Sequence, residues 1–300
     1  MNNDHMEFSD FLNEIRDKIP DYLMQYEIES INISPVSKNN GKTYTGLAII
    51  LKGEKLAPNI YMEYYYMLYC HEKDMDHILR LVADEYKEAY ESMDKSQFLL
   101  MDEDECMLKN NIFLKLVNLE KNRNQIEDCP YIEFMDLAIT FRVMVHRDVK
   151  GIASAALKYS DVERWKLDIE ELYDIAHKNT LRMFPPVVKR LDAVLEEKIS
   201  DTKEIPKNSD LYILTNADGV NGATCILFDD ILREFGEKHG GFYILPSSIH
   251  ETLLLPAHGL EDRGELEEMV RDINRYVVSD MDYLSDTVYY YNPDRQKIEM

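Results

Sequence analysis

The residue types best suited to chemistry lie in one short segment, Pro246 to Glu251, which reads Pro-Ser-Ser-Ile-His-Glu. Ser248, His250 and Glu251 bring together a hydroxyl, an imidazole and a carboxylate, the groups used in nucleophilic hydrolysis. Ser248 and His250 are two residues apart, so they would share one face of an unbroken strand, and Glu251 would lie on the other. This spacing makes the three residues candidates for a hydrolase-like site.

A structural interpretation of the same segment competes with this one. Pro246 cannot donate to a strand ladder, which argues against an unbroken strand, and serine hydroxyls commonly bond to nearby backbone. The Gly-x-Ser-x-Gly turn of many hydrolases is absent from the sequence. We therefore assign no catalytic residue, and predict that the segment places Ile249 in the core while its serines hold a kink.

Metal and cofactor motifs are missing from the sequence. The four cysteines, at positions 70, 106, 129 and 225, form no Cys-x-x-Cys pair, and the eight histidines form no His-x-x-x-His or His-Glu-x-x-His. The glycines form neither a phosphate-binding loop nor a dinucleotide fingerprint. We predict no metal, no cofactor and four reduced thiols in a reducing compartment.

The charge is strongly acidic, with 34 basic against 57 acidic residues and a net charge of −23. The excess is spread evenly, because residues 1–150 carry 17 basic and 28 acidic residues and residues 151–300 carry 17 and 29. This field disfavours nucleic acid and anionic membrane as direct partners. The acidic charge could attract a basic protein partner or let the protein act as a DNA mimic. It could also be an ordinary acidic surface with no specific partner.

Targeting and membrane segments are not recognisable either. The longest apolar runs, such as Leu47 to Leu51, are too short to cross a bilayer, and Met1 to Phe11 lacks the basic and apolar parts of a secretory signal. We therefore expect a soluble cytoplasmic protein.

The elements that would position Ser248 and His250 follow from periodicity in the C-terminal region. Residues 211–255 predict strand–helix–strand, with a helix over Ala223 to Lys238 and strands over Phe242 to Leu245 and Ile249 to Leu255. A helix over Glu261 to Tyr276 and a strand over 287–291 follow.

The rest of the chain alternates in the same way. We expect a helix over 7–19, a hairpin over 26–52 turning at Asn40-Gly41, a strand then helix after Pro58, and a helix over 75–93. Residues 112–118 are ambiguous between strand and helix. Strands over 136–145 and 152–159, around a turn at 147–151, precede a helix that Asn179-Thr180 and Pro185-Pro186 end. Another helix would start at Pro186, and residues 200–209 read as a polar loop.

Hairpin-paired strands interleaved with helices predict an α+β fold with antiparallel or mixed sheets. We divide the chain into an N-terminal α+β region, residues 1–130, and a C-terminal α+β region, residues 131–300, which could pack as one unit.

Several ordered segments resemble those of an uncharacterised family, a domain of unknown function found in Gram-positive anaerobic bacteria. They are residues 39–41, 58–61, 116–122, 136–139, 178–180, 214–216, 222–223, 245–251 and 284–286. The most specific string is Leu-Pro-Ser-Ser-Ile-His-Glu. The part from Asp136 to Pro256 is also similar to a second uncharacterised bacterial family, with Trp165 and Asn179 at matching positions. Neither resemblance implies an activity.

These observations favour a non-catalytic cytoplasmic binding or accessory protein that contacts another macromolecule. The alternatives are a hydrolase-like enzyme with a site near Ser248, His250 and Glu251, and an acidic DNA-mimic inhibitor. The oligomeric state does not follow from the sequence.

Overall fold

The computed structural model describes residues 6–54, 57–93, 105–148, 151–198, 210–259 and 262–300. They form two compact units. Unit 1 contains residues 6–38 and 42–93, and unit 2 contains Asn39–Gly41 together with the described residues from 105 to 300.

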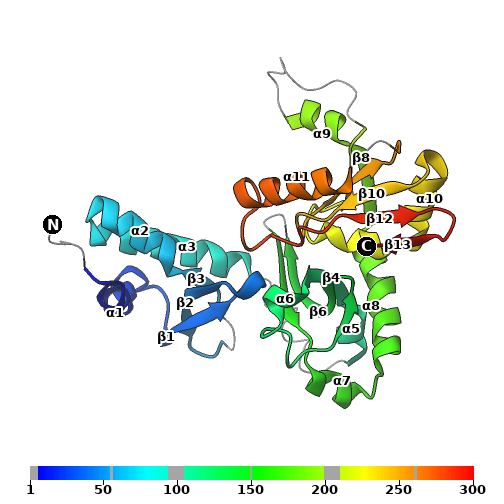
Figure 1. Cartoon of the computed structure of the whole chain (residues 1–300). Helices are drawn as coiled ribbons and strands as arrows, with labels where there is room; N and C mark the ends of the chain where they lie inside the picture. Colours follow the sequence, from blue (N-terminus) through cyan, green and yellow to red (C-terminus); the bar gives the residue numbers. More distant parts are fainter. Residues whose placement is uncertain (1–5, 55–56, 94–104, 149–150, 199–209, 260–261) are drawn as a thin grey trace. The chain divides into compact units, whose positions relative to one another are not determined.

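Unit 1 is a three-stranded antiparallel sheet, ordered β1-β2-β3, packed with helices (Figure 1). Its elements are α1 (Phe8–Lys18), η1 (Ile19–Tyr22), β1 (Ile28–Ser37), β2 (Thr43–Leu51), β3 (Asn59–Tyr61), α2 (Met62–Glu72) and α3 (Met75–Ser92). The apolar stripes of α1 and α3 pack on the sheet, with Phe11, Ile49 and Tyr86 fully buried between them. The predicted helices and hairpin are confirmed, and the turn residues Asn40 and Gly41 both take positive φ.

Unit 2 begins with a four-stranded antiparallel sheet in which β6 pairs with β4, β5 and β7. The elements are α5 (Glu105–Asn110), β4 (Ile112–Asn118), α6 (Leu119–Asn122), β5 (Tyr131–Phe134), β6 (Leu137–Asp148), β7 (Gly151–Ala156), α7 (Tyr159–Trp165) and α8 (Ile169–Met183). Residues 112–118, ambiguous in the sequence, form a strand that is buried on both faces, which explains their nearly continuous apolar pattern.

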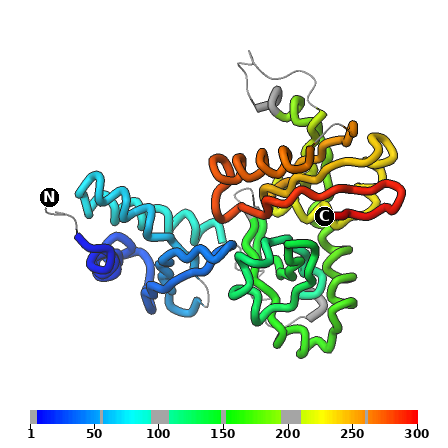
Figure 2. The backbone as a smooth tube through the Cα atoms, in the orientation of Figure 1, coloured from blue at the N-terminus to red at the C-terminus, as the bar shows by residue number. Residues whose placement is uncertain are grey.

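A six-stranded antiparallel sheet, ordered β13-β12-β10-β11-β9-β8, completes unit 2. Its elements are β8 (Pro186–Arg190), α9 (Leu191–Lys198), β9 (Tyr212–Asn216), η3 (Gly222–Leu227), α10 (Asp229–His239), β10 (Phe242–Leu245), β11 (Thr252–Pro256), α11 (Arg263–Tyr276), β12 (Tyr289–Asn292) and β13 (Lys297–Glu299). One face of β10 and β11 packs into the main core of the unit, which also contains α8, α10 and β4. The other face carries α11, the orange helix alongside the sheet in Figure 2.

The predicted α+β class with hairpin-paired strands is confirmed, and several local predictions are wrong. Residues 186–190 form β8 and not a helix, because their backbone pairs with β9. Asn179 and Thr180 do not end α8, which runs to Met183; their side chains instead bond to Lys109 O and to the Leu114 N–H. Residues 223–238 are broken at Phe228, whose extended backbone separates η3 from α10.

Two further differences concern boundaries. The sheet of β4, β5 and β6 takes strands from both sides of residue 130. Strands β6 and β7 reach closer to their turn than expected, and the expected polar loop at 200–209 lies outside the described residues.

In the part that the structure describes, no helix is long and apolar enough to cross a membrane.

Candidate functional site

The segment from Pro246 to Glu251 connects β10 to β11 and is not a strand. The prediction of a strand from Ile249 is wrong, since β11 begins only at Thr252. The segment runs beside residues 282–285, and three backbone hydrogen bonds join the two stretches: Ile249 N–H to Asp282 O at 2.8 Å, and Leu284 and Ser285 N–H to the carbonyls of Ser247 and Pro246 at 3.0 Å. This pairing replaces the strand ladder that Pro246 interrupts.

Ile249 points into the main core of unit 2 and is 5% exposed. Its N–H bonds to Asp282 O, and its carbonyl accepts the Ala223 N–H at 3.2 Å. The Ser248 hydroxyl accepts the His250 backbone N–H at 3.0 Å, which is the local serine turn that the structural interpretation predicts.

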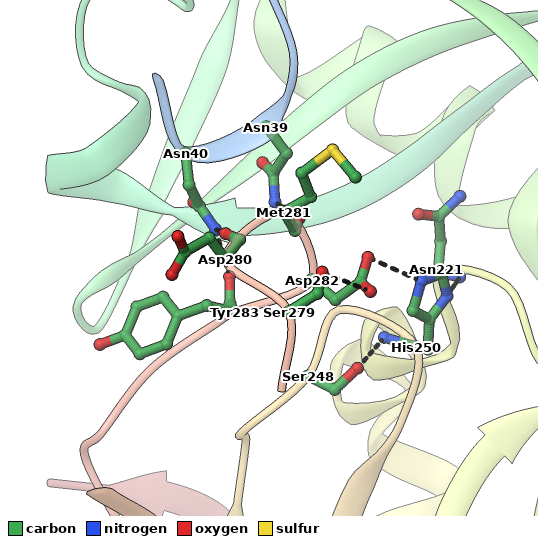
Figure 3. A network of polar contacts seen from close by, with 10 residues as sticks. All are labelled: Asn39, Asn40, Asn221, Ser248, His250, Ser279, Asp280, Met281, Asp282 and Tyr283. Carbon is green, nitrogen blue, oxygen red and sulfur yellow. Dashed lines mark hydrogen bonds and ion pairs between the residues drawn. The ribbon is translucent and has the colours of Figure 1, made fainter. Parts of the chain in front are cut away.

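His250 has both ring nitrogens engaged (Figure 3). The backbone N–H of Asn221 donates to Nδ1 at 3.3 Å, so Nδ1 carries no proton, and Nε2–H then donates to Asp282 Oδ1 at 3.2 Å. The carbonyl of His250 accepts the Thr215 hydroxyl at 2.8 Å. The imidazole therefore ties three segments of the chain together and makes no hydrogen bond to Ser248.

The three residues that the sequence places together are thus not assembled as a nucleophile, base and orienting acid. Ser248 is 5% exposed, and its oxygen already accepts a backbone proton. Within the described residues, the Glu251 carboxylate has no hydrogen bond or ion pair. The carboxylate that meets His250 is Asp282, from a loop 32 positions later in the chain.

The loop that contains Asp282, residues 279–287, is held from a second side by the hairpin tip at residues 39–41 (Figure 3). Asn39 Nδ2 donates to Met281 O at 2.7 Å, and Asn40 Nδ2 donates to the carbonyls of Asp280 and Tyr283 at 2.8 and 2.7 Å.

Asn40 also exchanges two hydrogen bonds with Asn122 of α6. Its N–H donates to Asn122 Oδ1, and its Oδ1 accepts from Asn122 Nδ2, both at 2.8 Å. Sequence reasoning saw in Asn40 a turn residue and a member of the family string, and missed its contacts with Asn122 and the loop. The asparagine-rich string at 39–41 was the available signal.

Asp136 anchors the far end of this loop. Its carboxylate accepts hydrogen bonds from the hydroxyls of Ser285, Thr287 and Tyr289. Burial, followed by the negative charge of Asp136, raises the pKa of Tyr289, so this phenol stays a donor. Sequence reasoning quoted Asp136 only within the family string and missed this role.

The segments that carry the resemblance therefore converge on one network in three dimensions. Asn118 Nδ2 donates to Leu284 O at 2.9 Å, and Asn122 Nδ2 donates to Asn118 O at 2.8 Å. Gly222 lies so close to Thr215 and the His250 carbonyl that a Cβ would overlap both. Residues from 39–41, 116–122, 136–139, 214–216, 222–223, 245–251 and 284–286 all take part.

A polar cleft of about 630 Å³ opens beside this network. Its volume lies within the range of roughly 300–1,000 Å³ that is typical of ligand-binding pockets. Its lining combines cations and carboxylates: Lys121, Glu268, Arg271, Asp272, Asn274, Arg275, Asp280, Tyr283 and Asp286.

Three side chains of this cleft, Lys121, Tyr283 and Asn274, have defined polar contacts. Lys121 Nζ lies 4.0 Å from the centroid of the Tyr283 ring. Burial, followed by the charges of Asp286 and Asp136, raises the pKa of Tyr283 to about 12. Asn274 is 8% exposed and donates to Ser285 O and Asp286, while its Oδ1 has no partner among the described residues.

The described residues contain no group of three or more His, Cys, Asp or Glu side chains that could hold a metal ion. Cys70, Cys129 and Cys225 are free thiols, and burial raises the pKa of Cys225 to about 12. The side chain of Cys106 lies outside the described residues.

Comparison with known proteins identifies the family. The family model of DUF5688, a family of unknown function, matches residues 8–293, and the chain belongs to this family. No curated protein and no solved structure matches the chain.

Proposed function

We propose that this protein is a non-catalytic binding protein that contacts another protein through the cleft beside residues 279–287. The observation that carries the proposal is the engagement of His250. Its two ring nitrogens hold Asn221 and Asp282, so His250 is not positioned to activate Ser248 as a base. A cytoplasmic location in a Gram-positive anaerobic bacterium is part of the proposal.

The charges of the cleft support a protein partner. In the part that the structure describes, Lys121 and Arg275 form no ion pair and make cation–π contacts with Tyr283 and Tyr276. Carboxylates from α11 and the loop line the same cleft. A protein surface can offer both signs of charge, whereas a polyanion such as nucleic acid would face these carboxylates and the net charge of −23.

The test is affinity capture from extracts of the native cell, followed by mass spectrometry. The full-length protein is compared with a double variant, Lys121→Glu with Arg275→Glu, that reverses the two cleft cations. A double variant of exposed residues near the C-terminus, Arg295→Glu with Lys297→Glu, changes the net charge equally and serves as the control.

A partner that the parent and the control retain, and that the cleft variant loses, supports the proposal. A partner that binds all three proteins equally removes the cleft as the contact. The hydrolase alternative is tested with Ser248→Ala: if this variant abolishes the cellular function while melting and capture stay unchanged, the protein is an enzyme and the proposal is wrong.

A further inference from the structure

A second surface of unit 2 lies at the edge of the six-stranded sheet. Strand β8, labelled in Figure 1, ends the strand order on one side and, among the strands of the described residues, pairs with β9 alone. An edge strand offers a row of backbone donors and acceptors that another extended segment can use.

The register identifies which groups of β8 face away from the sheet. Ala217 N–H donates to Pro185 O at 3.0 Å, and Val188 lies opposite Leu214. Because hydrogen-bonded positions alternate in an antiparallel pair, the odd-numbered residues of β8 bond to β9 and the even-numbered ones direct their N–H and C=O outward. Within the described chain, the backbone groups of Val188 have no hydrogen-bond partner.

A groove of 470 Å³ runs between this edge strand and helix α10. Pro186, Val188 and Arg190 line it from β8, and their side chains share one face because they alternate along the strand. The Val188 side chain is 38% exposed. An apolar residue thus stands beside unpaired backbone groups, as in the sheet edges that accept an added strand.

The floor of the groove is aromatic and preformed. Tyr212 and Phe235 contact each other edge to face with centroids 5.0 Å apart, and the His239 ring stacks on Phe235 at 4.4 Å. Ile231 from α10 adds a partly buried aliphatic wall. These rings pack against one another, so an incoming apolar side chain would meet a surface that needs little rearrangement.

The groove presents two cations in a chain that is acidic as a whole. Arg190 and Lys238 line it together with a single carboxylate, Glu234, in a chain whose net charge is −23. Lys238 bonds to Glu234 at 2.6 Å, and Arg190 bonds to Asp192 at 2.7 Å. Each cation is therefore already paired with one carboxylate in an exposed ion pair, and a carboxylate of a ligand would bind here by joining or exchanging with one of these pairs.

We infer that β8 and the groove beside α10 bind an extended peptide segment of a partner protein, which adds to the sheet as a further strand. Its backbone bonds to Val188, one apolar side chain covers Tyr212 and Phe235, and an acidic group faces Arg190 or Lys238. A helix could not satisfy the edge in this way, because its backbone groups already bond to one another. No residue lines both this groove and the cleft at residues 279–287, so the inference does not depend on the proposed function.

The experiment selects a phage library of random decapeptides on the immobilised full-length protein and measures the enriched peptides by fluorescence anisotropy. Val188→Pro removes the outward N–H without touching the bonds to β9, and proline is tolerated at such an edge. Val188→Thr keeps the N–H and is the matched control. We expect peptides that combine an apolar and an acidic residue, about tenfold weaker binding to Val188→Pro, and little change with Val188→Thr.

Amide hydrogen exchange on the parent protein gives a second measurement that does not depend on a variant's folding. The Val188 amide should exchange fast in the free protein and slowly with an enriched peptide bound. No enrichment above the starting library, equal binding to Val188→Pro, or an unprotected Val188 amide in the complex would each overturn the inference. Loss of peptide binding leaves capture through Lys121 and Arg275 unaffected, so the two proposals fail separately.

Discussion

Replacing Ile249 by alanine tests whether the segment from Pro246 to Glu251 is a structural device. The side chain is 5% exposed and lies in the main core of unit 2, while the backbone of Pro246, Ser247 and Ile249 is bonded to residues 282–285. If the segment serves to anchor this core, removing the side chain must lower the stability of unit 2 substantially.

The magnitude follows from the three carbon atoms that the substitution removes. Their transfer alone is worth about 2.4 kcal/mol, at roughly 0.8 kcal/mol for each buried methylene. The cavity that remains adds to this, so we expect a loss of about 3–4 kcal/mol, inside the range of roughly 2–5 kcal/mol for such core truncations. For a unit of this size, each kcal/mol lowers the melting temperature by about 2–4 °C, giving a decrease of roughly 6–16 °C.

The assay is differential scanning calorimetry together with urea unfolding of the full-length chain. Ile249→Val serves as a graded control and should cost about 0.5–1.5 kcal/mol, because it removes a single methylene. His250→Ala, measured in parallel, removes the hydrogen bonds to Asn221 and Asp282 but no core side chain.

The result that refutes the reasoning is a specific combination. If Ile249→Ala melts like the parent protein while His250→Ala abolishes the cellular function without loss of stability, the segment is functional and the structural interpretation is wrong.

Three other predictions follow from single contacts. Gly222→Ala should cost about 3 kcal/mol or more, since a Cβ there overlaps Thr215 and a backbone carbonyl, whereas Gly219→Ala, with positive φ but open space around it, should cost only about 1–2 kcal/mol; equal unfolding midpoints would contradict this. Mass spectrometry after alkylation without reductant should find all four thiols free, with Cys70 modified before the buried Cys225, whose pKa is raised to about 12; a disulfide would disprove the first part and fast labelling of Cys225 the second. Because the pKa of Tyr283 is about 12 in the folded protein and about 10 when unfolded, its contribution to stability is complete below pH 10 and is lost as the pH rises towards 12. The absorbance titration of the Tyr283→Phe variant is subtracted from that of the parent protein, and the difference should have its midpoint near pH 12. A midpoint near pH 10 would count against the burial of the phenol.

Local signals decided much of the fold. The stripe of α3, the Asn40-Gly41 turn and the strand–helix–strand order of residues 211–255 all depend on periodicity or on turn residues, which act between neighbours in the chain. The prediction of secondary structure was wrong where pairing with a segment distant in the sequence overrode the local preference. Residues 186–190 could have started a helix after Pro185, but β9 supplies a strand ladder to which they pair.

The candidate site was predicted only in part. The sequence pointed to the correct segment, and it suggested that Ile249 is buried and that a serine holds the bend, both of which the structure contains. It could not supply Asp282 as the partner of His250, nor the hydroxyls that surround Asp136, because 32 and about 150 positions separate these groups along the chain.

By itself, then, the sequence determined the α+β class, the charge and the short-range turns, since these depend on residue type and on spacing of a few positions. Only the tertiary structure decided what Asn40, Asp136 and His250 do. Each uses its side chain to bond backbone, hydroxyl or carboxylate groups of residues 279–289, and the choice of those partners is fixed by how the sheets of unit 2 pack around the loop. The outward edge of β8 is likewise a product of strand order, because a strand becomes an edge only when no other strand of the sheet pairs with its free side.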